Sequence, residues 1–228
     1  MDPVDENGEQ QEMEDDKSSP FTEFIIVATI CGRTLEHKQQ PLSDAPLHSS
    51  KSDNQQGQHD AIVYEFCRRH QFLNSALTRR IKFLSLLVSS NSGHPDPALV
   101  FVTLLAYMAL FVLCDTALES PSSLSSNQAS QATQVADALL LEHKRRSLDA
   151  VHELSVLIAT LSQLNHFQTH PLTPIPLLLS ARFCLAHSRG QSNDDSYSTL
   201  VPKIATALQG LTSVNGLAQH CLWLLGSG

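Results

Sequence analysis

The sequence is poor in aromatic residues and in glycine, and it lacks several short motifs that mark enzyme families. Aromatic side chains make up 6% of its 228 residues, and glycine occurs nine times. It contains no GxSxG nucleophile, no phosphate-cradling glycine loop and no HExxH metal motif. We therefore predict no catalytic residue and no enzymatic activity, and the absence of alternating β-branched runs or an Asn-Gly hairpin excludes a β-rich fold.

The five cysteines are odd in number and widely scattered, at Cys31, Cys67, Cys114, Cys184 and Cys221. This spacing fits reduced thiols inside the cell rather than a disulfide framework. The chain starts MDPVDENGEQQ, which is acidic where a secretory signal is basic and then apolar. We expect no export or transit peptide.

Negative charge is concentrated at one end of the sequence. Residues 1–17 hold eight acids against Lys17 alone, a balance of −7 out of a net charge of −8 for the whole chain. We interpret residues 1–18 as a disordered acidic tail. The remainder is close to neutral and shows no basic face for nucleic acid.

Apolar residues recur at helical spacing along most of the chain, which predicts an all-α fold, an irregular bundle of about six or seven helices. Ser19 with Pro20, Asp96 with Pro97, and Thr173 with Pro174 have the pattern of an N-cap followed by proline at the first helical position. Two polar, low-complexity stretches, 39–60 and 120–131, predict long loops. We also expect a break near His70 and place Pro202 in the first turn of its helix.

One stretch, Ala98 to Cys114, is apolar throughout and carries no charge. A surface helix has a polar face, so this segment is either a core helix or a membrane span. It falls just short of the ~20 residues that a bilayer crossing needs, and no Lys or Arg flanks it. We predict a soluble core helix surrounded by amphipathic ones and no membrane partner, with a membrane anchor as the alternative.

Eleven histidines make a metal site worth testing. The candidate pairs are Cys184 with His187 and His166 with His170, and His220 with Cys221 could in principle complete the first. Each is a single pair, whereas a structural zinc site requires four converging ligands. We therefore predict no metal ligand in this chain. The basic groups, Arg79 to Lys82 and Lys144 to Arg146, are interpreted as solvated helix faces rather than phosphate-binding or nuclear-import patches.

Several stretches are familiar as a set and in this order. They are SPFTEFIIVATICGRTLEHKQQ, YEFCRRHQFLNSALTRRI, DPALVFVTLLAYMALFVLC, LSQLNHFQTHPLTPIPLLLSARF and VNGLAQHCLWLL. This set resembles the C-terminal half of the regulatory, or fungal-specific transcription factor, domain of zinc binuclear cluster transcription factors. The resemblance spans about Ser19 to Leu225, and its most specific pieces are Pro20 to Arg33 and His170 to Leu177.

The resemblance implies that residues 19–228 are part of such a domain, or a truncated remnant of it, and regulate transcription by RNA polymerase II in the nucleus. It implies protein partners or self-association and admits a small-molecule effector. Members of that family bind DNA through an N-terminal module in which six closely spaced cysteines hold two zinc ions. This sequence has no such cluster of cysteines. Zinc and DNA contact would belong to that module, so we expect no cofactor here. An all-α enzyme with an unrecognised site is the remaining alternative.

Overall fold

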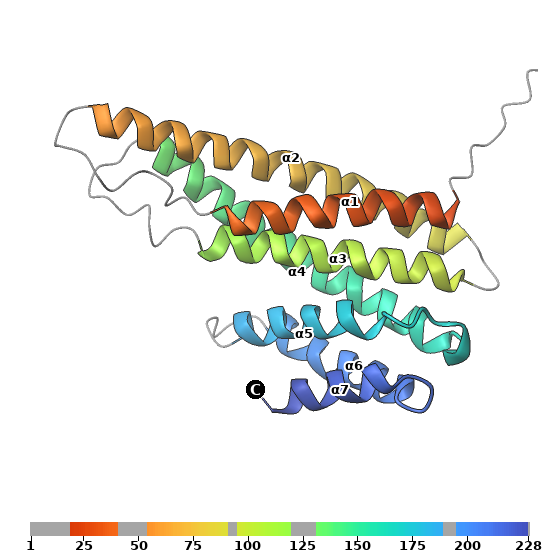
Figure 1. The fold of residues 1–228 in the computed structure, drawn as a ribbon. Helices are drawn as coiled ribbons and strands as arrows, with labels where there is room; N and C mark the ends of the chain where they lie inside the picture. The colour runs from red at the N-terminus through yellow and green to blue at the C-terminus, as the bar shows by residue number, and fades with distance from the viewer. Residues whose placement is uncertain (1–18, 41–53, 91–94, 120–130, 189–194, 228) are drawn as a thin grey trace, which may run out of the picture.

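The computed structural model describes residues 19–40, 54–90, 95–119, 131–188 and 195–227. These residues form α-helices and one short 3-10 helix, η2, with no strand among them, which confirms the all-α prediction (Figure 1). The elements are α1 Pro20–Gln39, α2 Asn54–Ser90, α3 Pro97–Glu119, α4 Gln131–Gln163, η2 His166–Gln168, α5 Pro174–Ser188, α6 Ser196–Leu211 and α7 Gly216–Gly226. The predicted acidic tail, residues 1–18, lies outside the described residues, as do most of the two predicted loops.

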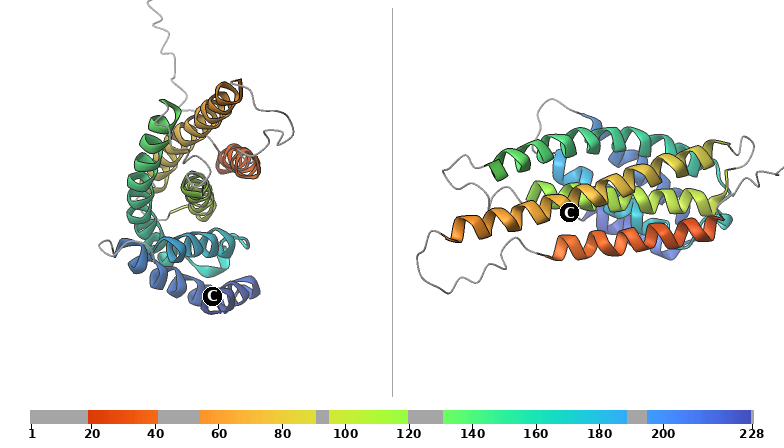
Figure 2. Two further views of the ribbon diagram at one scale, coloured as in Figure 1. Left: turned by 90° about the vertical axis from the view of Figure 1, so that its left-hand side faces the viewer. Right: turned by 90° about the horizontal axis from the view of Figure 1, so that it is seen from above.

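The helices stack in two layers. In the end-on view of Figure 2, α1, α3, α5 and α7 form one layer, and α2, α4 and α6 form the other. Successive helices run in opposite directions, and each contacts mainly the helices next to it or next but one in sequence. The arrangement is that of helical hairpins piled along one axis, so α1 with α2 lies at one end and α7 at the other.

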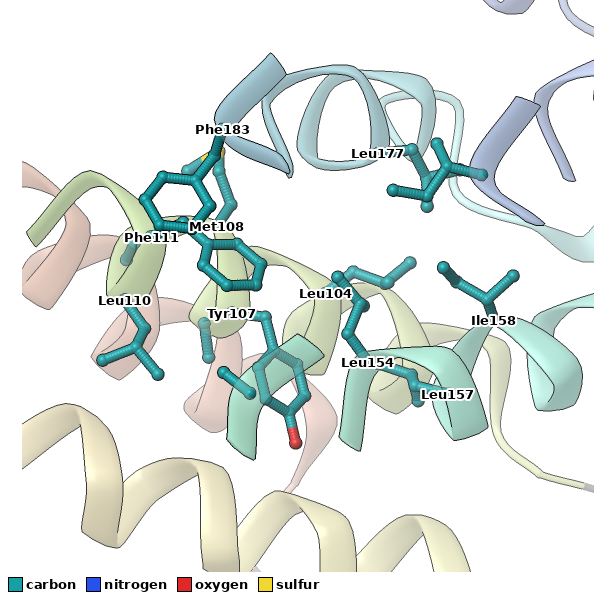
Figure 3. Packing of buried hydrophobic residues seen from close by; sticks show 14 of the residues in the cluster. Leu104, Tyr107, Met108, Leu110, Phe111, Leu154, Leu157, Ile158, Leu177 and Phe183 are labelled. Atoms are coloured by element: carbon teal, nitrogen blue, oxygen red, sulfur yellow. The ribbon is translucent and has the colours of Figure 1, made fainter. Parts of the chain in front are cut away.

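Helix α3 lies at the centre of this stack, in contact with α1, α2, α4 and α5. The segment 97–117 is long and apolar enough to cross a membrane, yet 78% of it is buried among the other helices. Leu104 packs toward Leu154 of α4, while Phe111 stacks on Phe183 of α5 with ring centroids 4.7 Å apart (Figure 3). Burial on all sides explains its lack of a polar face and supports the core-helix prediction over the anchor.

The predicted helix starts are present. The Ser19 hydroxyl accepts from the Thr22 amide at 3.2 Å, and the Asp96 carboxylate accepts from the Ala98 amide at 2.8 Å. Proline follows each cap at the first helical position, where its missing N–H leaves no hydrogen bond unmade. Helix α5 likewise begins at Pro174, after the buried Thr173.

Two local predictions about α2 were wrong. This helix begins at Asn54, inside the stretch 39–60 that was predicted to be a loop, because polar residues such as glutamine extend a helix readily once it has formed. It also continues through His70 without a break. His70 lies on the buried face, where other side chains satisfy both of its ring nitrogens.

The predicted position of Pro202 was also wrong. Helix α6 begins at Ser196, so Pro202 is the seventh helical residue and lies in the second turn rather than the first. Proline has no amide hydrogen, so the carbonyl of Ser198 loses its usual helical partner. The helix nevertheless continues to Leu211, because buried side chains on both sides of Pro202, such as Leu200 and Ile204, hold it against the core.

Candidate functional site

The structure separates the members of each metal-binding pair considered from the sequence. Cys184 is fully buried. His187, one turn later, donates from Nδ1 to the Phe183 carbonyl at 2.8 Å, and its Nε2 lies 4.0 Å from an Asp115 oxygen. The imidazole is therefore engaged away from the thiol.

His166 and His170 also point to different neighbours. The ring of His166 lies against α6, close enough that a Cβ on Gly210 would stand 3.0 Å from its Cε1. The ring of His170 stacks on that of Phe101, with ring centroids 3.9 Å apart, and its Nδ1 accepts a hydrogen bond from the Leu172 amide. Both rings therefore pack the segment between α4 and α5 against neighbouring helices.

On α7, Cys221 is buried, whereas His220 is exposed and stacks on Trp223. Across the described part of the chain, no group of three or more His, Cys, Asp or Glu side chains is placed to hold a metal ion. The prediction that the chain has no metal ligand stays a prediction.

Four residues that the sequence did not connect form a buried polar chain. His37 of α1 lies 3.0 Å from His70 of α2, nitrogen to nitrogen, and His70 lies 2.8 Å from His143 of α4. The other nitrogen of His143 is 3.5 Å from the sulfur of Cys114 on α3. The chain thus ties together four helices through side chains that are almost completely buried. Its ring nitrogens meet end to end rather than converging on one point.

The hydrogen bonds of this chain must all run in one direction, because a neutral imidazole has one donor and one acceptor. The Nδ1 atom of His37 is buried without a partner. If that atom is the acceptor, His37 donates to His70, His70 to His143 and His143 to the Cys114 sulfur. The opposite direction would strand a buried N–H at His37, which is rarer in proteins than an unused lone pair. The structure thus favours donation from α1 toward α3.

Burial keeps these imidazoles neutral. Desolvation, followed by the neighbouring rings of His143 and His37, lowers the pKa of His70 to about 2. Desolvation also lowers the pKa of His37 to about 4, helped by the Arg69 guanidinium, and that of His143 to about 4. A chain of neutral rings near physiological pH holds helices together and does not act as a general acid.

Sequence reasoning missed these four residues because successive members of the group lie 33, 73 and 29 residues apart in the sequence. A signal was nevertheless present. His37, His70 and His143 all occupy positions on the apolar stripes of their helices, where a polar side chain must find a buried partner. Only the packing of the helices showed which partner each one finds.

The cysteines have no reactive character. All five are buried and unpaired. Burial raises the pKa of the Cys31 thiol to about 11, and those of Cys114 and Cys184 to about 12. Thiols with such pKa values are protonated near neutral pH and make poor nucleophiles.

A second polar cluster lies beneath a groove between α2 and α4. The Tyr107 hydroxyl of α3 donates to Glu153 at 2.9 Å, and the Arg146 guanidinium is 3.8 Å from the same carboxylate. Desolvation, followed by the charge of Glu153, raises the pKa of Tyr107. The groove has a volume of about 500 Å³ and is lined by Ile81, Lys82, Ser85, Leu86, Ser89, Tyr107, Glu153 and Val156.

The fold exposes some residues of the two basic groups, Arg79 to Lys82 and Lys144 to Arg146, and pairs others with carboxylates. Arg80 binds the fully buried carboxylate of Glu23 on α1, with its Nη1 2.9 and 3.0 Å from the two oxygens. Arg146 is mostly buried beside Glu153. Arg79, Lys82, Lys144 and Arg145 remain exposed. Two of the four arginines in these groups, Arg80 and Arg146, thus lie beside carboxylates within the protein.

The end of the stack formed by α1 and α2 exposes several large apolar side chains. Contacts between Glu23 and Arg80 and between His37 and His70 fix the antiparallel register of these two helices. Their exposed large apolar residues include Phe21, Ile25, Leu35, Phe72 and Phe83, besides Tyr64 and Leu86. Apolar surface of this extent at the end of a helical stack is typical of a protein-contact face.

Comparisons with known proteins find relatives that are named as transcription factors. Over 205 residues, or 90% of this chain, it is 33% identical to a pigment biosynthesis transcriptional activator of Monascus ruber. It is 32% identical over 209 residues to a citrinin biosynthesis transcriptional activator of Monascus purpureus, and 29% identical over 209 residues to the asperfuranone cluster transcription factor of Emericella nidulans.

The chain spans about a third of the length of these relatives: 33% of the first, 32% of the second and 30% of the third. No family model matches the sequence, and no solved structure matches it. What the comparisons establish is that the relatives of this all-α chain are fungal transcription factors, several of them named for a biosynthetic pathway.

Proposed function

We propose that this chain regulates transcription in a fungal nucleus, as a regulatory segment of the kind found in pathway-specific transcription factors. The observation that carries the proposal is the similarity along 90% of the chain to named transcriptional activators. The relatives named for pigment, citrinin and asperfuranone suggest that the genes it controls belong to a biosynthetic cluster.

The geometry supports a role in binding rather than in catalysis. Within the described residues, the polar groups of the interior are used to join helices, as in the histidine chain, and the buried thiols are protonated. The end of the stack at α1 and α2, by contrast, offers apolar side chains to a partner. We propose that this chain has no enzymatic activity and that it contacts other proteins of transcription through this end.

The two alternative functions find less support. A membrane anchor would have to expose α3 to lipid, but this helix lies at the centre of the stack and most of its surface is packed against its neighbours. An enzyme would require a pocket of converging groups with pKa values suited to proton transfer near neutral pH. The buried groups with shifted pKa values here, among them the histidines, the thiols and Tyr107, are shifted away from that range.

The test is to fuse the chain to a heterologous DNA-binding domain and to measure a reporter gene in a fungal host. We expect activation or repression relative to the DNA-binding domain alone. Replacing Phe21 and Phe72 together with glutamate removes the exposed apolar end and should abolish the effect. The matched control is Leu141→Glu, an exposed leucine on α4. An unchanged reporter with the intact chain under all growth conditions would contradict the proposal.

A further inference from the structure

The groove between α2 and α4 leaves large apolar side chains uncovered. Leu86 of α2 and Val156 of α4 line its two walls, and Tyr107 of α3 is among its lining residues. The exposed fractions of Leu86 and Val156 are 70% and 69%. Apolar side chains gathered around a concave surface are a common mark of a ligand site. The volume of about 500 Å³ is within the range of sites for small organic molecules.

The charged groups of the groove are not equivalent. Glu153 is already engaged, since Tyr107 donates to it and Arg146 lies nearby. Lys82 is exposed, and no ion pair with it occurs among the described residues. Among the described residues that line the groove, Lys82 is thus the cation available to a ligand, beside an apolar surface. A ligand with a single negative charge complements it.

We propose that this groove binds a small organic anion with an apolar body. The body lies between Leu86 and Val156, and the carboxylate of the ligand pairs with the Lys82 ammonium group. Glu153, held by Tyr107, accepts a hydrogen bond from a hydroxyl of the ligand and repels a second carboxylate. The same negative charge disfavours a nucleic-acid strand. The site goes beyond the proposed function, because ligand binding here requires no DNA and no transcription partner.

The experiment uses the full chain and two aromatic probes of similar shape, 2-naphthoate and its neutral analogue 2-naphthamide, with binding followed by calorimetry or probe fluorescence. We expect saturable binding of 2-naphthoate at one site. Lys82→Met keeps the length of the side chain but removes its charge. This variant should weaken 2-naphthoate binding up to about fivefold, the loss of one exposed ion pair, and leave 2-naphthamide binding unchanged.

Arg79→Met is the matched control, because Arg79 is an exposed cation one turn earlier on α2. It should bind both probes like the unaltered chain, whereas Leu86→Ser should weaken binding of both. Unfolding curves verify that each variant is folded, which is expected because these side chains are exposed. The proposal is overturned if Lys82→Met and Arg79→Met weaken 2-naphthoate equally, if neither does, or if no saturable binding occurs up to about 1 mM probe.

Discussion

At the scale of single residues, the interior of this protein is unusual in the polar groups it contains. A histidine chain and a buried ion pair lie between helices that are otherwise joined by leucine, valine and alanine. Buried polar groups stabilise a fold only when their hydrogen bonds are satisfied, and they then fix one packing arrangement over others. Both clusters join α1 to α2, so they set the register of the hairpin at the end of the stack.

The histidine chain makes stability depend on pH. In the unfolded state a histidine has a pKa near 6.5, while burial lowers the pKa of His37 and His143 to about 4. Between these values the unfolded state binds more protons, so the free energy of unfolding should be highest above pH 6.5 and should fall as the pH drops toward 4. The expected slope is about 1 kcal/mol per pH unit for each histidine.

Urea unfolding at a series of pH values measures this slope. His37→Phe replaces the terminal ring, which already stacks on Phe66, with an apolar ring and should reduce the slope. The control is His152→Gln, on the exposed face of α4, which should leave the slope unchanged. A free energy of unfolding that is constant from pH 7 to pH 4 would refute the neutral, buried state of the chain.

The ion pair between Glu23 and Arg80 yields a second prediction. Glu23 is completely buried, so Arg80→Met leaves a carboxylate without its cation inside the protein. We expect a loss of about 3 kcal/mol in the free energy of unfolding. Adding Glu23→Gln to that variant removes the stranded charge and should restore part of the loss. If the double variant is as unstable as the two single losses added together, the pair is not coupled.

At the scale of elements, the helix starts with a cap followed by proline could be predicted from the sequence, whereas the start of α2 and its continuity needed the structure. A cap followed by proline at Ser19, Asp96 and Thr173 reports local geometry, and local geometry is written in adjacent residues. The continuity of α2 through His70 depends on His37 and His143, which come from other helices. The polarity of His70 alone suggested a break in the helix, but histidines from two other helices satisfy its hydrogen bonds.

Pro202 provides the test at this scale. It lies in the second turn of α6 on an exposed position, where it removes one helical hydrogen bond. Pro202→Ala should restore that bond and stabilise the protein by about 1–2 kcal/mol, since part of the gain is offset by the greater freedom of the unfolded chain. Thermal unfolding measures the change, with Ala205→Gly in the same helix expected to lower stability. A lower melting temperature for Pro202→Ala would show that the helix is adapted to its proline.

At the scale of the whole molecule, α3 connects the two ends of the stack. Stacks of helical hairpins sometimes unfold piecemeal, because each unit contacts only its neighbours. Here one apolar helix contacts α1, α2, α4 and α5 at once. We therefore expect the two ends to unfold together.

The single tryptophan, Trp223 on α7, reports on one end through its fluorescence, and labelling of the buried Cys31 on α1, distinguished from the other four cysteines by peptide mass spectrometry, reports on the other. The two signals should change at the same urea concentration. Phe111→Ala removes the stacking on Phe183 and should cost about 3–5 kcal/mol. It should shift both transitions together. Separate midpoints in the unaltered chain would show that α3 does not couple the ends.

The all-α class, the buried central helix and the helix starts marked by a cap and a proline could be predicted from the sequence, because periodicity and capping are properties of neighbouring residues. The two-layer stack, the histidine chain, the pairing of Arg80 with Glu23 and the groove beside Lys82 became visible in the folded structure. Each of these brings together residues from helices far apart in the chain. Their partners are set by how apolar faces pack, which one sequence does not encode in any local pattern.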